Sequence, residues 1–180
     1  MDNETFKPIF EDNSFNEIEG DWREHYALPW GRHTLELRAR GGVIDDLEVD
    51  DFFHFAIGSR PGLRGYTYYS AQGRKLGLGS ITYRFPIFGR VNRQFLQFLM
   101  HRLYGGVFYE AGNVWNDNGL EGLSADRLLK DAGFELRLDA TSFYVFPAAL
   151  YLEGAYALDA APDVGGKDDW RFYSGLLFGF

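Results

Sequence analysis

The feature that most constrains the fold is a regular alternation of apolar residues over the last eleven positions, residues 170–180. Because successive side chains of a strand point to opposite faces, this spacing predicts a strand. Ser174 is the one interruption on the apolar side. Such a strand presents a continuous apolar face to one environment. The residues of that face are Trp170, Phe172, Leu176, Phe178 and Phe180.

The same alternation recurs in six earlier segments, so seven strands are predicted in total. Each segment is near or above the roughly 9–11 residues that cross a bilayer as a tilted strand. In most of them, charged residues occupy the face opposite the apolar one. Residues 4–10 could add an eighth strand and give an even number, since Pro8 is tolerated on an edge strand. The six earlier segments are residues 17–28, 33–43, 75–87, 102–115, 129–140 and 143–158.

Composition excludes several classes of protein. A net charge of -8 and a pI near 5.0 argue against a nucleic-acid-binding protein, which would carry a basic stripe. The absence of cysteine excludes disulfides and thiolate metal sites. No apolar run approaches the roughly 18 residues that a membrane helix needs. The acidic start of the chain lacks a secretory signal, so we expect a mature form, a recombinant piece or part of a longer chain.

Alternation alone does not say which face points inward, because membrane and soluble barrels share the same period. Two observations favour a membrane barrel. Aromatic residues lie near the strand ends, as in interfacial girdles, and short connections alternate with long polar ones. The short connections are 29–31 and 141–142, and the long ones are 44–73, 116–127 and 159–169. Connection 88–101 is long where a short one is expected, which suggests strand extensions or a short interfacial helix.

The sequence therefore predicts an all-β fold, an antiparallel transmembrane β-barrel of about eight strands. Residues 1–14 form an N-terminal segment that could supply the extra strand. Residues 15–180 form the barrel domain, with a long surface loop over residues 44–73.

Three motifs occur in a characteristic order. An Arg-Gly-aromatic tip, residues 64–66, lies on the long loop, and a strand ends in Arg-Phe-Pro at residues 84–86. A third strand carries Glu110, Gly112 and Trp115. Together with a terminal phenylalanine, this set resembles the surface-antigen superfamily of bacterial outer-membrane barrels, which includes the BamA-type insertases. The resemblance extends over nearly the whole chain.

The segment that ends with the third motif, residues 92–115, resembles one branch of this superfamily, in which the barrel follows a TolB-like β-propeller. Thr82 departs from the pattern, since relatives often have an acid there. A second acidic partner for the loop arginine is therefore not predicted.

The resemblance implies a lock between the loop and the barrel wall. Arg64 would fold back into the lumen and pair with Glu110, which alternation independently places on the polar face. Gly65 would allow a positive φ, Tyr66 would supply packing, and Gly112 belongs to the same motif. The alternative is a solvated turn with an unpaired arginine. The resemblance also implies that Leu176, Phe178 and Phe180 form a C-terminal signal for the barrel assembly machinery.

The chain is short for this superfamily, whose barrels have about sixteen strands. An open half-barrel in lipid would leave rows of unpaired backbone groups, at several kcal/mol each. One chain could close a small barrel, two chains could pair, or another polypeptide could complete the wall. A closed eight-stranded barrel has little room beyond its own side chains, so it could not conduct a polypeptide.

No enzyme signature, cofactor motif or metal site is found. The acidic residues 45–51 favour a solvated loop, and the lumen charges favour a structural network. We expect a bacterial outer-membrane anchor that participates in protein insertion or translocation. Its partners would be lipid or lipopolysaccharide, the assembly machinery, and a second copy or complementing barrel chain, but not nucleic acid. The alternatives are a soluble lipocalin-like barrel that binds a small apolar ligand and an excised fragment without independent activity.

Overall fold

The computed structural model describes residues 15–45, 50–60, 62–117, 119–143, 145–160 and 170–179. Within these ranges the fold is all-β, with two short 3-10 turns, η1 (Asp51–Phe53) and η2 (Glu121–Leu123). No helix in this part of the chain is long and apolar enough to cross a membrane. The predicted all-β class is confirmed.

Seven long strands correspond to the seven predicted segments. The alternation located them because it is a local property of each segment. Two short strands were not predicted, β3 (Phe55–Ile57) and β4 (Ala71–Gly73), and a third, β6 (Arg93–Phe95), lies in the connection 88–101, where strand extension was one of the two expectations. The long strands are β1 (Glu17–Ala27), β2 (Thr34–Ile44), β5 (Lys75–Phe88), β7 (Phe98–Trp115), β8 (Leu129–Ser142), β9 (Phe146–Ala157) and β10 (Trp170–Phe178).

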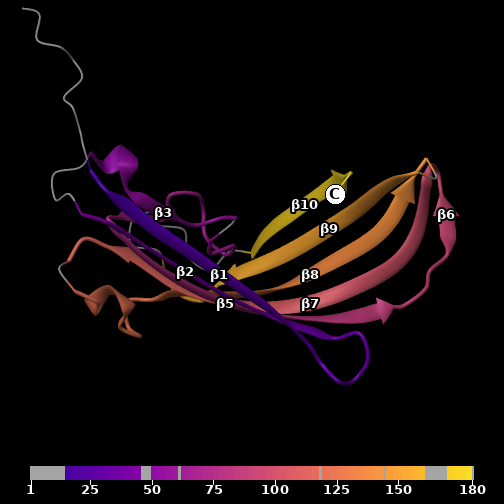
Figure 1. Ribbon diagram of the computed structural model, residues 1–180, viewed down its shortest axis with the longest axis horizontal. Helices are drawn as coiled ribbons and strands as arrows, with labels where there is room; N and C mark the ends of the chain where they lie inside the picture. The colour runs from indigo at the N-terminus through magenta and orange to yellow at the C-terminus, as the bar shows by residue number, and fades with distance from the viewer. Residues whose placement is uncertain are drawn as a thin grey trace, which may run out of the picture.

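The long strands form one curved antiparallel sheet in the order β1-β2-β5-β7-β8-β9-β10, with β6 paired to β7 (Figure 1). The sheet is open, because β1 and β10 are its two edges and do not pair with each other. Closure into a barrel is thus not observed in the described part of the chain. The extra strand predicted over residues 4–10 lies outside the described residues.

The long connection at 88–101 consists of strand extension rather than helix. β6 continues the line of β5 and pairs with the start of β7, for example Phe95 with Phe98. On the other side, the β7–β8 ladder runs to the pair Phe98–Ser142. The predicted turn at 141–142 is therefore wrong, since both residues belong to β8. The chain turns after them, from Phe143, which has a φ of 49°.

The two faces of the sheet differ sharply in burial. On the apolar face, Trp22, Phe172 and Phe178 are 51%, 64% and 56% exposed. On the opposite face, Glu110 and Glu153 are only 5% and 4% exposed. The loop between β2 and β5 packs onto one end of the polar face and buries these acids, whereas every residue of β1 remains exposed.

That loop has a small core of its own. β3 and β4 pair as a two-stranded sheet, and their side chains pack with residues near the ends of the long strands. The segment predicted as a polar surface loop is thus an ordered cover on one end of the polar face. Its buried apolar cluster comprises Ile44, Phe55, Ile57, Leu63, Tyr66, Ala71, Leu76, Leu78, Val114, Leu129 and Ala157.

Candidate functional site

The structure brings Arg64 of the loop against Glu110 of β7. The Arg64 Nε donates to Glu110 Oε1 at 3.1 Å, and Nη2 lies 3.0 Å from the same oxygen. The backbone N–H of Arg64 donates to Glu110 Oε2 at 3.0 Å. Both residues are buried, so water competes little with these charge-assisted bonds. One carboxylate therefore holds both the side chain and the backbone of the loop tip.

Two further acids surround the guanidinium. Arg64 Nη1 lies 3.5 Å from Glu135 Oε2 and 3.6 Å from Glu153 Oε2. Glu135 and Glu153 face each other across β8 and β9. They give Arg64 acidic partners beyond the single pairing with Glu110 that the sequence predicted. The guanidinium carbon also lies 3.4 Å from the centre of the Phe108 ring, a cation–π contact.

Three acids around one arginine require further positive charge, which two neighbouring arginines provide. Arg60 Nη2 lies 3.1 Å from Glu153 Oε1. Arg84 contacts Glu135 and also Glu36 on β2. These ion pairs run across the polar face from β2 to β9. They fit the structural charge network that the sequence favoured over a catalytic pair.

Gly65 is required by close approach, not by a positive φ. Its N–H donates to Asp131 Oδ2 at 2.6 Å. A Cβ at this position would lie 2.7 Å from Asp131 Cβ and 2.9 Å from the Ala157 nitrogen, both closer than van der Waals contact allows. The glycines with positive φ in the described ranges are Gly31, Gly58, Gly119 and Gly179. The sequence-based reason for Gly65 was therefore wrong, although the need for glycine was correct.

Tyr66 fixes the far side of the tip. Its ring belongs to the loop core, and its hydroxyl lies 2.8 Å from the Lys130 carbonyl oxygen and 2.9 Å from that of Asp159, so its one proton is donated to this pair of acceptors. Burial raises the pKa of Tyr66 to about 12. The hydroxyl consequently stays protonated, and able to donate, well into the alkaline range.

Tyr66→Phe is expected to destabilise the protein by about 0.5–1.5 kcal/mol, because the hydrogen bond of the hydroxyl is lost, although the Lys130 carbonyl still accepts from the Leu158 N–H. Since the pKa is higher in the folded protein than the ordinary value of 10, this contribution is complete below pH 10. It is lost as the pH rises through about 12. Urea unfolding of wild type and variant between pH 8 and pH 12 measures the difference, with Tyr68→Phe at an exposed position as the control. A difference independent of pH would contradict the assignment.

Two residues of the last strand, β10, complete the site, and no sequence motif had indicated them. The Tyr173 hydroxyl donates to the Arg64 carbonyl at 2.7 Å, and Arg171 Nε donates to the Gly65 carbonyl at 3.1 Å. Both project from the polar face of β10, more than one hundred residues along the chain from the loop tip. The tip therefore contacts β7, β8, β9 and β10.

The remaining predicted residues lie apart from the loop tip. A Cβ at Gly112 would meet Gly77 O at 2.9 Å and Leu78 Cα at 3.1 Å, so this glycine allows close packing of β5 on β7. Leu176 and Phe178 lie on the apolar face of β10 and are 43% and 56% exposed. Phe180 lies outside the described residues.

The described residues contain no cluster of three or more His, Asp or Glu side chains suited to a metal ion. In the acidic stretch 45–51, the Asp45 carboxylate accepts two hydrogen bonds from Asn16, at 2.9 and 2.7 Å. Asp50 accepts from the Phe52 N–H and caps η1. Residues 46–49 lie outside the described ranges. These contacts give Asp45 and Asp50 structural roles.

The function of this chain has to be inferred from the arrangement of its residues. No protein-family model matches the chain, and no curated protein matches it at a significant level. The resemblance to the surface-antigen superfamily therefore stays an expectation from motifs. The loop tip and the two unlike faces of the sheet are the features on which a function can be based.

Proposed function

We propose that this chain forms part of the wall of a bacterial outer-membrane β-barrel of the surface-antigen type. The single observation that carries the proposal is the burial of the two faces. Large apolar side chains, such as Trp22 and Phe172, stay exposed, while Glu110 and Glu153 lie under the loop. Contiguous apolar surface of this extent is unusual on a soluble monomer. It is the expected outer surface of a strand wall in hydrocarbon.

In this proposal the charged face lines the lumen, and the tip formed by Arg64, Gly65 and Tyr66 locks the surface loop there. Its contacts span four strands, so the lock also fixes the C-terminal edge strand relative to its neighbours. The role of the domain is membrane anchoring, with participation in protein insertion or translocation. Lipid or lipopolysaccharide, the assembly machinery and a strand-bearing partner at the open edges are the proposed partners, because unpaired backbone is costly in lipid.

A soluble lipocalin-like barrel requires apolar residues to line the interior. The cavity of about 970 Å³ on the polar face is instead lined by ionic side chains, including Glu36, Arg84 and Glu135. Its lining includes eight charged side chains and only two leucines, so an apolar ligand there would lie against ionic groups. This observation favours the membrane arrangement over the soluble one.

Spin labels on two adjacent residues of β5 test the orientation. The chain has no cysteine, so Ile81→Cys and Ser80→Cys give single sites on opposite faces, and each can be labelled with a nitroxide. In lipid vesicles, we expect the label at residue 81 to collide mainly with oxygen, which concentrates in hydrocarbon. The label at residue 80 should collide mainly with a water-soluble nickel complex.

Heat-modifiable migration on SDS gels after refolding checks that both variants fold. Equal accessibility of the two labels to the nickel complex would contradict the proposed orientation. So would unmodified protein that stays monodisperse in buffer without detergent.

A further inference from the structure

A groove of about 840 Å³ lies where the apolar face approaches the loop end of the sheet. Its floor follows from register: Ala39 pairs with Gly79, Gly79 with Ala111, and Gly41 with Gly77. Because these positions point to the same face as the exposed Ile81, three neighbouring strands lack large side chains there. The apolar surface of the sheet is thus hollowed at this place.

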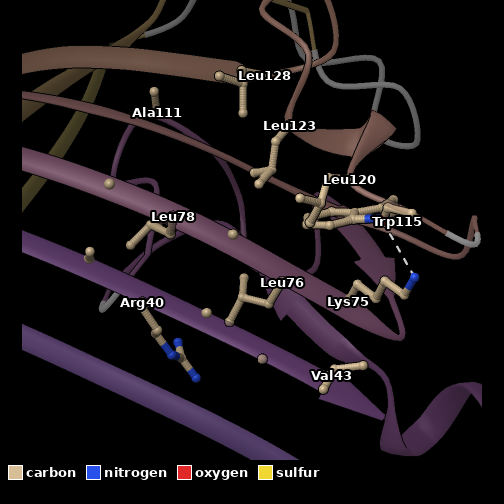
Figure 2. Close-up of a pocket in the computed structure, with 16 residues that line it drawn as sticks. Arg40, Val43, Lys75, Leu76, Leu78, Ala111, Trp115, Leu120, Leu123 and Leu128 are labelled. Carbon is tan, nitrogen blue, oxygen red and sulfur yellow. Dashed lines mark hydrogen bonds between the residues drawn. The ribbon is translucent and has the colours of Figure 1, made fainter. Parts of the chain in front are cut away.

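The walls of the groove are also apolar. The segment around η2 folds over the end of β7, and Figure 2 shows Leu120 and Leu123 gathered beside Trp115. The Trp115 indole N–H donates to the Gly119 carbonyl at 3.0 Å, which holds this segment in place. Leu120 and Leu123 remain 75% and 42% exposed, although the surrounding connection is polar and acidic. Their exposure next to the hollow indicates a surface that is completed by an apolar occupant.

The end of the groove carries a positive charge. Lys75 lies beside Trp115 at the start of β5 (Figure 2). Its Nζ donates to the carbonyl oxygens of Asp117 and Gly119 at 2.8 and 3.4 Å, so the ammonium is held at the loop end by neutral acceptors. An apolar groove that ends at a fixed ammonium matches a phosphate-bearing lipid, with its acyl chain along the strands and its head group at the loops.

We propose that this groove binds one acyl chain of a phosphate-bearing membrane lipid, with the lipid phosphate beside Lys75. The inference rests on the proposed function, which puts the apolar face in contact with the bilayer. The proposed site would bind one lipid specifically, whereas the rest of the apolar face would contact any membrane lipid. The small residues of the floor and the exposed leucines of the wall fit the acyl chain. The ammonium of Lys75 fits the phosphate.

Native mass spectrometry of protein released from detergent micelles tests the site, with dimyristoylphosphatidylglycerol as the added lipid. Gly79→Leu fills the groove, because a Cβ there would have no neighbour closer than 4.0 Å. Ser174→Leu is the control: it adds a leucine to the exposed apolar face of β10, at the edge of the sheet away from the groove. We expect wild type and the control to retain one lipid and Gly79→Leu to lose it. Lys75→Gln should reduce retention of this lipid towards that of dimyristoylphosphatidylcholine.

Each other outcome overturns the proposal. Equal retention by Gly79→Leu and the control, or no retention by wild type, excludes a lipid site at the groove. Loss of a dimer in Gly79→Leu would identify the occupant as a second copy of the chain. Gly41→Leu, where the nearest atom is 3.7 Å away, replaces Gly79→Leu if that variant fails to fold. The spin-label experiment on β5 is independent, so the membrane orientation can hold while the lipid site fails.

Discussion

Arg64→Ala is expected to lower the free energy of unfolding by about 3–5 kcal/mol, because it removes the cation shared by three carboxylates, two of which, Glu110 and Glu153, are buried. Glu110, Glu135 and Glu153 would remain within the same covered region with too little positive charge. The loop would also lose its side-chain attachment to β7. Urea unfolding in detergent, followed by tryptophan fluorescence, measures the change.

Arg127→Ala is the control for this variant. Arg127 also pairs with a carboxylate, Asp117, but both side chains are more than half exposed. Exposed pairs contribute about 0–1 kcal/mol, so the control should unfold almost like wild type. Adding Glu110→Gln to Arg64→Ala should recover part of the loss, because one uncompensated charge is removed. If the two alanine variants unfolded alike, Arg64 would not be the residue that locks the loop.

Gly65→Ala should be the second strongly destabilising change, by about 1–3 kcal/mol, because a methyl group has no space at this position. The added Cβ would overlap Asp131 Cβ and the Ala157 nitrogen, and backbone cannot move away as a flexible side chain can. The tip would then have to withdraw from β8 and β9. Faster trypsin cleavage after Arg64, together with a lower unfolding midpoint, would report this withdrawal.

Gly62→Ala is the matched control in the same loop. The nearest atoms to its added Cβ lie 3.6 Å away, an ordinary contact. We expect its stability to stay within about 0.5 kcal/mol of wild type and its cleavage rate to be unchanged. Equal effects at the two positions would mean that the tight contact of Gly65 has no special importance.

The long strands could be predicted because the alternation of apolar and polar residues is a local property of each segment. β3 and β4 could not, since each has only three residues and too few alternations to detect. The end of β8 was misjudged because Thr141 and Ser142 are typical turn residues, while pairing with β7 keeps them in the ladder. Here tertiary pairing overrides the local preference.

The site was predictable only in part. The pairing of Arg64 with Glu110 followed from a motif, because the tip and the strand acid occur together in the resembling superfamily. Asp131, Arg171 and Tyr173 could not be found in this way, since their proximity depends on how β8 and β10 are placed in the sheet. Gly65 shows a further limit of prediction from sequence. The motif indicates that a glycine is needed, but it does not say whether the reason is a positive φ or the lack of space for a Cβ.

The order and direction of the paired strands restrict which strands can close the open sheet into a barrel. Six successive antiparallel pairings link the first long strand to the last, so β1 and β10 run in the same direction. If these two met directly, or if a second copy inserted with the same orientation, the seam between them would be parallel. Two antiparallel seams instead require an odd number of complementary strands, whose first and last members both run opposite to β1. Parity therefore makes a different β-sheet segment, rather than an identical subunit, the natural complement of these seven strands.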